Sequence, residues 1–425
     1  MWIKKIIFAL VLVSIHSYAQ LEYSPTELFD EGIYFMDRED FVESSYYFKN
    51  LALKYPENCH YNFLAGVCYL NIQNKEHLSI PYFEIAINNL VEKKKHRLRS
   101  FDETAAPLHA VFYLGIAYRA NNQLTEALEM YKQFVESPLY SYNYNDNVVA
   151  QEVKSCEMAL TIQKEPIQVH AEKLPLGVNS EFVESNPVLS GNGQVLVFVR
   201  TLKFYDAVYY SKKENDNWST PVNISPQIVS DGNFYPTAVS YDGKKMLLIK
   251  IGANQSDIYS SNFNNNTWSP AVKLQGKINS LGNETSATFL KDTNHIILTS
   301  NRIGGKGGYD IYSTTLNTDK NKWSKPKKIK NLSSDYDETS ISYNKQCQKL
   351  YFSSKGHSNM GGYDIFSSSA VGKTWELPQN IGYPINSTRD NKNFTPGPDC
   401  NTVILAKPDS NNADVSDLWL IRIIE

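Results

Sequence analysis

Apolar and polar residues follow two different patterns along the chain, and the change comes near Pro166. Residues 24–165 are rich in Leu, Ala, Glu and Lys, a composition that favours helices. From Pro166 onward, short apolar runs with many β-branched residues are separated by stretches of Ser, Asn, Gly and Asp, which favours strands joined by turns. The pattern therefore predicts a helical domain followed by an all-β domain.

The helical half contains a repeated unit. Gly32 and Gly66 lie 34 residues apart, and a third unit centres on Gly115. Each unit has a small residue in its first helix, an aromatic residue three positions later, and a second small residue 12 or 13 positions after the glycine. The small residues let paired helices approach closely. The matching positions are Leu28, Gly32, Phe35, Ser44, Phe48 and Pro56; Gly66, Tyr69, Ser79, Phe83 and Ala86; and Tyr113, Leu114, Gly115, Tyr118, Ala127 and Tyr131. Residues 92–107 form an insertion before the third unit, and a helix over 148–164 is expected to cap the stack.

This pattern resembles the tetratricopeptide (TPR) repeat. In that family the concave surface is formed by the fifth, ninth and twelfth positions of the first helix of each unit. Carried over to this chain, those candidate protein-binding positions are Phe29, Ile33, Met36, Phe63, Val67, Leu70, Phe112, Ile116 and Arg119. One interpretation is a groove that receives a partner's helix or extended segment. The other is that the capping helix or the β domain fills the groove internally.

The β half repeats at about 50 residues. Five serines occupy equivalent places, at intervals of 50, 50, 54 and 53 residues: Ser180, Ser230, Ser280, Ser334 and Ser387. Each begins a loop that leads into a strand. Tight turns such as Asn192-Gly193 and Asp242-Gly243 follow, because Gly and Asn tolerate the positive φ that a hairpin requires. An apolar strand comes next in every unit.

A third strand in each unit carries an Asp-apolar-aromatic triplet, with a variant in the first unit. The triplets begin at Asp206, Asp257, Asp310, Asp364 and Asp417. A Trp followed closely by Pro comes next in the first four units, and a short fourth strand ends each of them. Four short strands in a repeated unit are typical of a β-propeller blade.

The fifth unit stops soon after Trp419 and has no fourth strand of its own. Pro166-Ile167-Gln168-Val169, in front of the first unit, matches fourth-strand segments such as Pro326-Lys327-Lys328-Ile329. The sequence therefore predicts a five-bladed propeller whose last blade is closed by this N-terminal strand.

These units resemble the WD40-like repeats of TolB-type propellers, and Tyr-Asp-Ile-Tyr after a Gly-rich hairpin (304–312) is typical of them. A TPR stack that runs into such a propeller resembles the N-terminal part of periplasmic OmpA-family proteins, including proteins of type IX secretion machinery. One departure matters, because the sequence ends at Glu425 without an OmpA-like domain. Peptidoglycan binding is therefore not carried over.

The first 19 residues read as an export signal. Lys4 and Lys5 precede an apolar run over 6–15, and Ser17-Tyr18-Ala19 is a small-x-small cleavage site. The expected domains are thus a signal peptide (1–19), a TPR-like domain (20–165) and a propeller (166–425), in a protein exported to the periplasm, without a transmembrane segment in its mature chain. The formal net charge of −3 gives no general attraction to nucleic acid.

The five cysteines have no CxxC spacing, which argues against a disulfide framework or a zinc site. They are expected to be small buried hydrophobic residues. One disulfide among Cys59, Cys68 and Cys156 stays open, since the compartment is expected to be oxidising.

Candidate chemistry is sparse. The Gly-rich stretches 304–308 and 361–362 sit in hairpins without the following helix that a phosphate loop needs. The recurrent triplet Asp is expected to be a structural acceptor, and His295 and His357 stand alone. Segments such as 211–218 have the Ser-to-Trp spacing of a sialidase Asp-box but lack its Asp, and the propeller has few arginines. We therefore expect no catalytic, cofactor or metal site.

The main hypothesis is a non-enzymatic periplasmic scaffold or adaptor for protein–protein interaction in a cell-envelope or outer-membrane assembly, with type IX secretion or gliding machinery as a setting implied by the resemblance alone. The alternative is a propeller that binds glycans or acts as a sialidase. A cluster of three arginines with Tyr and Glu at the central mouth would favour the alternative, and a mouth lined by Ser, Asn and Lys favours the scaffold.

Overall fold

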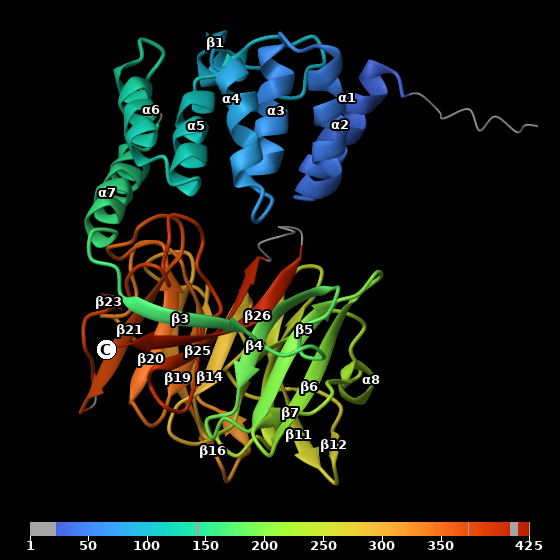
Figure 1. Cartoon of the computed structure of the whole chain (residues 1–425), viewed down its shortest axis with the longest axis vertical. Helices are drawn as coiled ribbons and strands as arrows, with labels where there is room; N and C mark the ends of the chain where they lie inside the picture. The colour runs from blue at the N-terminus through green and yellow to red at the C-terminus, as the bar shows by residue number, and fades with distance from the viewer. Residues whose placement is uncertain (1–22, 142–143, 373, 409–414, 425) are drawn as a thin grey trace, which may run out of the picture.

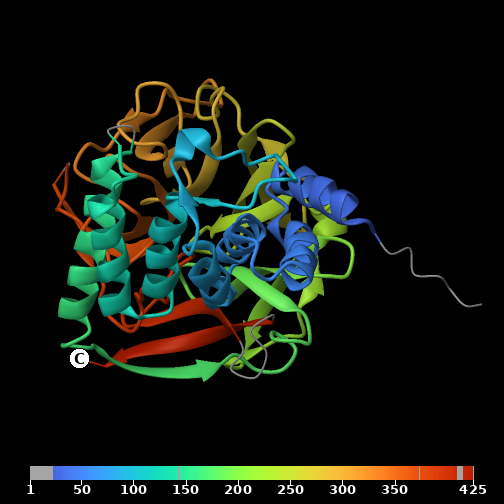
Figure 2. The ribbon, with the colours of Figure 1, turned by 90° about the horizontal axis from the view of Figure 1, so that it is seen from above.

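The structure, a computed structural model, describes residues 23–141, 144–372, 374–408 and 415–424. It consists of a stack of helices and a β-propeller, and the helices lie over one face of the propeller (Figures 1 and 2). The predicted signal peptide, 1–19, falls outside the described residues. None of the helices in the described part of the chain combines the length and the apolarity needed to cross a bilayer.

The helical part contains antiparallel helical hairpins and a final long helix. The α-helices are α1 (Pro25–Met36), α2 (Phe41–Lys54), α3 (Cys59–Leu70), α4 (Ile80–Ala86), α5 (His109–Ala120), α6 (Leu124–Glu136) and α7 (Asp146–Ile162). Short 3-10 turns, η1 (Glu76–Ser79) and η2 (Lys93–Lys95), and a two-stranded pair, β1 (Leu90–Val91) with β2 (Ala106–Pro107), complete it. A capping box between Ser24 and Glu27 starts α1.

The repeated small residues are contact points between paired helices, as their spacing suggests. A Cβ atom placed on Gly32 would lie 2.7 Å from the ring of Phe48, and one on Gly66 would lie 2.7 Å from Phe83. A Cβ atom on Gly115 would lie 2.5 Å from the ring of Tyr131. Each hairpin therefore closes on an aromatic ring of its second helix, which fits the predicted repeat. Membership of the TPR family stays a prediction.

The β half is a five-bladed propeller, as predicted. Four blades have their strands in chain order: β4 (Val183–Leu189), β5 (Val195–Thr201), β6 (Asp206–Glu214) and β8 (Val222–Asn223); β9 (Phe234–Val239), β10 (Lys245–Ile251), β11 (Ser256–Asn264) and β13 (Val272–Lys273); β14 (Glu284–Phe289), β15 (His295–Ser300), β16 (Asp310–Asn317) and β18 (Lys327–Lys328); β19 (Glu338–Asn344), β20 (Lys349–Ser354), β21 (Asp364–Val371) and β23 (Gln379–Asn380). Each of these blades also has a two-residue strand at its Trp: β7 (Asn217–Trp218), β12 (Thr267–Trp268), β17 (Lys322–Trp323) and β22 (Thr374–Trp375). A one-turn helix, α8 (Ser225–Ile228), follows β8.

The fifth blade joins the two ends of the β half. Its strands are β24 (Thr395–Pro396), β25 (Thr402–Pro408), β26 (Ser416–Ile424) and β3 (Gln168–Lys173). β3, which precedes the first blade in the sequence, pairs antiparallel with β26. The innermost strands β24 and β4 are linked by a hydrogen bond of 2.5 Å from Thr395 Oγ1 to the carbonyl of Pro187.

The cysteine expectation was wrong for two residues. Cys347 and Cys400 form a disulfide with a Cα–Cα distance of 5.8 Å, between the inner hairpin turns of the fourth and fifth blades. Cys59, Cys68 and Cys156 are buried free thiols. The disulfide spans 53 residues, the same interval as Ser334 to Ser387, because its cysteines occupy equivalent places in neighbouring blades. The repeat interval was the signal that could have identified the pair.

Candidate functional site

Four of the nine predicted groove residues are buried. Phe29 is 1% exposed, Phe63 5%, Phe112 8% and Arg119 5%. The others, Ile33, Met36, Val67, Leu70 and Ile116, are partly buried. The three rings that were expected to offer an apolar groove therefore pack inside the helical part. Protein binding through the partly buried members of the set stays a prediction.

The insertion at 92–107 packs on two of these rings. The ring of Phe101 lies 5.9 Å from that of Phe29, edge to face, and His96 lies 5.7 Å from Phe63. The hydroxyl of Tyr61 donates a hydrogen bond of 2.8 Å to the Phe101 carbonyl. At these positions the structure shows internal filling, by a segment other than the two that the sequence suggested.

A histidine pair fastens the insertion to α3. His96 Nε2 and His60 Nδ1 are 3.0 Å apart, so one nitrogen donates to the other. Burial lowers the pKa of His60 to about 3, and it lowers the pKa of His96 as well. Both rings are therefore neutral near pH 7, and the contact does not depend on a charge.

Arg119 lies at the joint between the helices and the propeller. Its Nε donates to Glu152 on α7 at 2.8 Å, and its Nη1 donates to the carbonyl of Thr388 in the propeller at 2.5 Å. Tyr131 donates to the same Glu152 oxygen at 3.2 Å. Arg119 was one of the candidate groove positions, for which the sequence left open a partner protein or internal filling, and here it contacts the propeller of its own chain.

Further contacts fix the joint. Arg389 donates to the carbonyl of Ala120 at 3.1 Å, and Ser155 donates to the side chain of Asn359. Met360, from the loop between β20 and β21, is fully buried in the apolar cluster around α6 and α7. Both parts therefore share buried polar and apolar contacts, and their surfaces are held in one arrangement.

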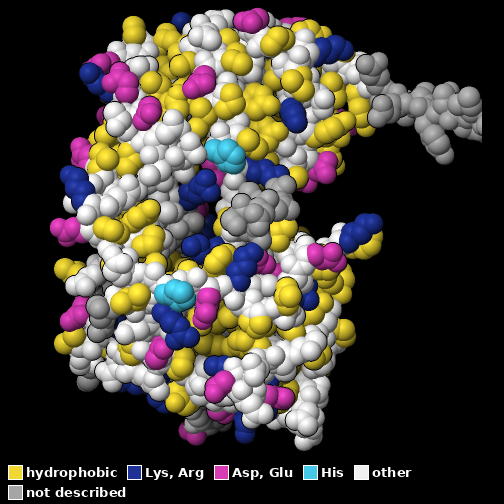
Figure 3. All heavy atoms as spheres, viewed as in Figure 1, with side chains coloured by type: hydrophobic (Ala, Val, Ile, Leu, Met, Phe, Trp, Pro, Cys, Tyr) yellow, Lys and Arg dark blue, Asp and Glu magenta, His cyan; other side chains and the backbone are white. Residues whose placement is uncertain are grey.

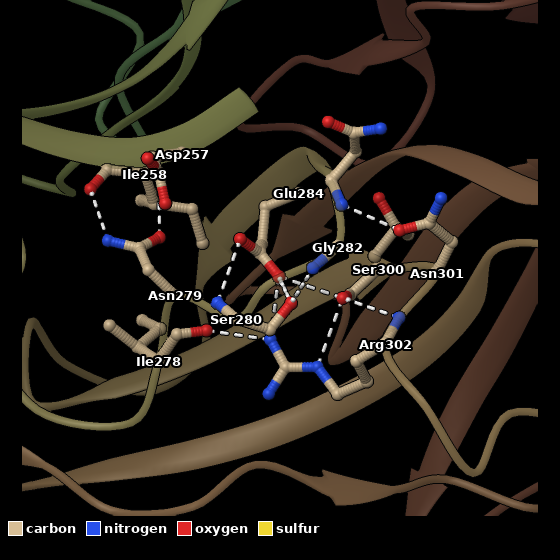
Figure 4. Close-up of polar contacts among 12 residues, drawn as sticks. Asp257, Ile258, Ile278, Asn279, Ser280, Gly282, Glu284, Ser300, Asn301 and Arg302 are labelled. Atoms are coloured by element: carbon tan, nitrogen blue, oxygen red, sulfur yellow. Dashed lines mark hydrogen bonds and ion pairs between the residues drawn. The ribbon is translucent and has the colours of Figure 1, made fainter. Parts of the chain in front are cut away.

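The recurring serines of the propeller anchor a polar network, shown for the third blade in Figure 4. Ser280 Oγ and Ser300 Oγ donate to one oxygen of Glu284 at 2.6 and 2.8 Å. Arg302 Nη2 donates to the same oxygen at 3.0 Å and to the carbonyl of Ile278 at 2.7 Å. Glu284 is fully buried, so the network ties the loop before β14 to the end of β15.

The network changes from blade to blade. In the first blade Glu184 accepts from Ser180 and Arg200. In the fourth blade Glu338 accepts from Ser334 at 2.5 Å and from Ser354 at 2.9 Å, and Gly356 stands where Arg302 would be. Phe234 and Asn391 replace the carboxylate in the second and fifth blades. The fourth blade therefore buries a carboxylate without an arginine partner.

The triplet aspartates are bound within the sheets, which fits the expected structural role. Asp257, Asp310 and Asp417 form ion pairs with lysines of the outermost strands, Lys273, Lys328 and Lys173. Asp364 instead accepts from Asn380 at 2.7 Å and from the backbone of Met360 at 2.7 Å. No group of three metal-ligating side chains occurs among the described residues.

The Gly-rich hairpins allow neighbouring blades to approach. Gly308 lies against the carboxylate of Asp337, and Gly362 lies against that of Asp390. A Cβ at either position would collide with the carboxylate, so glycine is required for packing. The two stretches are contacts between blades, not phosphate loops.

Two buried carboxyl groups predict a pH-dependent stability. Burial raises the pKa of Glu338 and of Asp364 to about 7. Because these values lie above those of the unfolded chain, the folded state holds more protons between about pH 4 and 7, and stability falls as the pH rises through 7. We expect the free energy of unfolding to drop by about 2–3 kcal/mol for each group between pH 5 and pH 8.

Urea unfolding of the full chain at pH 5, 6, 7 and 8 measures this dependence. Glu338→Gln should flatten the profile, and Asp364→Asn should do the same. Asp216→Asn, at a side chain that is 98% exposed, is the control that should leave the slope unchanged. A slope that survives in both buried-site variants would contradict the assignment.

A cavity of about 350 Å³ occupies the centre of the propeller. It is lined by the innermost strands and by their hairpin turns, which lie at the opposite strand ends from the loops that touch the helices. Ser, Thr, Asn, Pro and Tyr dominate, with Lys291 and Lys345, and the described lining contains no Arg, Glu or His.

Both carboxylates of the lining accept hydrogen bonds from residues of their own turns. Asp242 accepts from Ser240 Oγ at 2.6 Å and from the backbone of Lys244. Asp292 accepts from the backbone of Asn294 at 2.8 Å and lies 2.8 Å from His295 Nδ1. Most glycosidases need one carboxyl group as acid and a second as nucleophile or base. Asp242 and Asp292 each have hydrogen-bond partners within their own turns.

No protein-family model matches the sequence, and no curated protein is significantly similar to it. Similarity is found to solved structures. TolB from Acinetobacter baumannii shares 15% identity at a TM-score of 0.38, over 58% of this chain and 56% of that chain. The chain thus spans little more than half the length of that TolB.

Two glycosidases match to a similar degree. The catalytic domain of an α-L-arabinofuranosidase from Coprinopsis cinerea shares 12% identity at a TM-score of 0.41, over 61% of this chain and 97% of that chain. An α-L-arabinofuranosidase from Lactobacillus brevis shares 13% at 0.39, over 58% and 93%. Propellers host unrelated functions, so these likenesses do not choose between a scaffold and an enzyme.

Proposed function

We propose that this chain is a non-enzymatic scaffold that holds other proteins of a cell envelope in a fixed arrangement. The buried joint at Arg119 carries the proposal, because it couples the helices rigidly to the propeller. A protein bound to the helical part would then keep a constant position relative to one bound to the propeller. The remaining TPR-like surface and the face of the propeller with the central cavity are the surfaces available for this role.

The setting is a further part of the proposal. The N-terminal pattern of Lys4, Lys5 and the apolar run supports export to the periplasm. The resemblance to the N-terminal part of OmpA-family proteins supports association with outer-membrane proteins, in type IX secretion or gliding machinery. Neither cofactor nor metal is needed for such a role.

A glycan-binding or glycosidase propeller is the second candidate. The glycosidases among the similar structures are the reason to keep it. Against it stand the lining of the central cavity, in which the described residues include no Arg or Glu, and the two aspartates that are hydrogen-bonded within their own turns. The mouth of the cavity contains Ser, Asn and Lys residues, the composition that we expect of a scaffold.

Affinity purification of the tagged full chain from native envelopes, after mild cross-linking, tests the proposal. We expect a reproducible set of envelope proteins at defined stoichiometry, and recovery of the chain in the periplasmic fraction. Purified chain should release no sugar from aryl sialosides or aryl arabinofuranosides. Sugar release, or the absence of any stoichiometric partner, would contradict the scaffold.

A further inference from the structure

The outer edge of the fifth blade differs from the outer edges of the other four. Their fourth strands, β8, β13, β18 and β23, are two residues long, whereas β3 runs over six residues with no break in its register against β26. β3 is the end of its sheet. Figure 2 shows β3, in green, along the margin of the propeller, with β26, in red, on its inner side. A long, unbroken edge of this kind is a template for a further strand.

Two hydrogen bonds identify the backbone groups of β3 that point outward. Leu174 N donates to the carbonyl of Leu418 at 2.9 Å, so Leu174 and every second residue before it face β26. Ile167 N instead donates to a carbonyl of the loop that follows β23, at 2.8 Å. Val169 and Ala171 therefore face outward, and within the described part of the chain neither has a backbone partner on that side.

The two faces of β3 carry different side chains. On one face His170 and Glu172 are exposed, and Glu172 lies 3.7 Å from Arg422 on β26. On the other face Val169 packs against the apolar cluster of the fourth and fifth blades. Figure 3 shows a histidine with acidic and basic side chains close to it on the visible face of the propeller. A strand added at this edge would meet His170 and Glu172, so its own charges determine whether it fits.

A second copy of β3 fits this edge in antiparallel orientation. Outward residues must face outward residues, so the two-fold axis can lie at His170, Ala171 or Glu172. With the axis at Ala171, the two copies of Ala171 exchange backbone hydrogen bonds, and each His170 stands opposite Glu172 of the other copy. An axis at Glu172 would place two carboxylates opposite each other, and an axis at His170 would pair two histidines. Charge complementarity therefore selects the axis at Ala171.

We propose that two copies of this chain pair through the edges of β3, so that two fifth blades form one continuous sheet across a two-fold axis at Ala171. An edge lysine commonly discourages such pairing. Here the Nζ of Lys173 lies 2.7 Å from Asp417 of its own blade, so its charge is already compensated. This inference goes beyond the scaffold function and concerns a surface that the joint with the helices does not use.

Sedimentation equilibrium of the purified full chain tests the pairing. We expect the average mass to rise from one chain toward two as the concentration increases from about 1 to 200 µM, because a single pair of strands is a small interface. His170→Glu should weaken association by about tenfold or more, since carboxylates then stand opposite each other. His170→Glu combined with Glu172→Lys restores opposite charges across the axis and should restore the dimer.

Lys327→Glu is the matched control, because it changes an exposed side chain on the outer strand of the third blade and should leave association unchanged. Unfolding curves confirm that each variant is folded. A monomer at every concentration, or a dimer that all variants form equally well, would overturn the proposal.

A disulfide between two different variants tests the register. One chain carries His170→Cys and the other carries Glu172→Cys. Directly opposite residues of a non-hydrogen-bonded pair have Cα atoms about 4.5 Å apart, within the range of a disulfide. We expect oxidation of the mixture to give a covalent dimer. Either variant alone places its cysteines diagonally, about 7–8 Å apart, and should cross-link far less. No cross-link in the mixture, or equal cross-linking in all three samples, would overturn the proposal.

The pairing and the scaffold function can fail separately. If the chain stays monomeric while envelope proteins copurify with it, the pairing is wrong and the scaffold stands. If the chain forms the dimer and recovers no other protein, the scaffold function is wrong and the pairing stands.

Discussion

Arg119→Ala is expected to lower the free energy of unfolding by about 3–5 kcal/mol, because it removes a buried guanidinium and leaves the partly buried carboxylate of Glu152 without its counter-charge. Glu152 would retain only the hydroxyl of Tyr131, and the carbonyl of Thr388 would lose its donor. Both defects fall at the joint, so the segment between Ile162 and Gln168 should also become more sensitive to protease. Urea unfolding and limited proteolysis of the full chain measure the two effects.

Arg422→Ala is the matched control. Arg422 forms an exposed ion pair with Glu172 at 3.7 Å, and its loss should cost less than about 0.5 kcal/mol. If Arg119→Ala behaves like this control in both measurements, the joint does not couple the helices to the propeller, and the scaffold proposal loses its main support.

Glu284→Gln is expected to lower the free energy of unfolding by about 3–5 kcal/mol. It leaves the guanidinium of Arg302, whose side chain is only 10% exposed, without its counter-charge. Glu338→Gln makes the same chemical change in the fourth blade, where no arginine is present. At pH 8 it should be neutral or stabilising, since it removes a buried carboxyl group whose pKa is raised to about 7.

Urea unfolding at pH 8 compares the two variants at equivalent positions. Opposite outcomes would assign the cost to the Glu284–Arg302 pair. Equal losses would mean that the serine hydrogen bonds, common to both blades, determine the stability of the network.

The blade count and the strand order could be predicted from the sequence because a propeller blade is built from local hairpins. Turn dipeptides and alternating apolar residues specify each hairpin within about 50 residues. The glycines of the helical repeat were readable for the same reason, since Gly32 meets Phe48 only 16 positions later. The Cys347–Cys400 disulfide was missed, although its spacing equals the repeat interval.

The candidate site was less readable. Nine groove positions followed from the resemblance to TPR repeats, but nothing in the sequence showed that Phe101 and His96 would pack over Phe29 and Phe63. The role of the insertion depends on where its loop folds back, and a loop of mixed composition carries no periodic signal.

The sequence by itself determined the two repeating units and the five blades, because the contacts that define each unit lie within one repeat. Only the tertiary structure decided how the two parts are joined. Arg119 bonds to the carbonyl of Thr388, 269 residues away, and every non-terminal residue has such a carbonyl. The residue type at position 388 therefore does not indicate this contact, and the joint could be identified only in the folded chain.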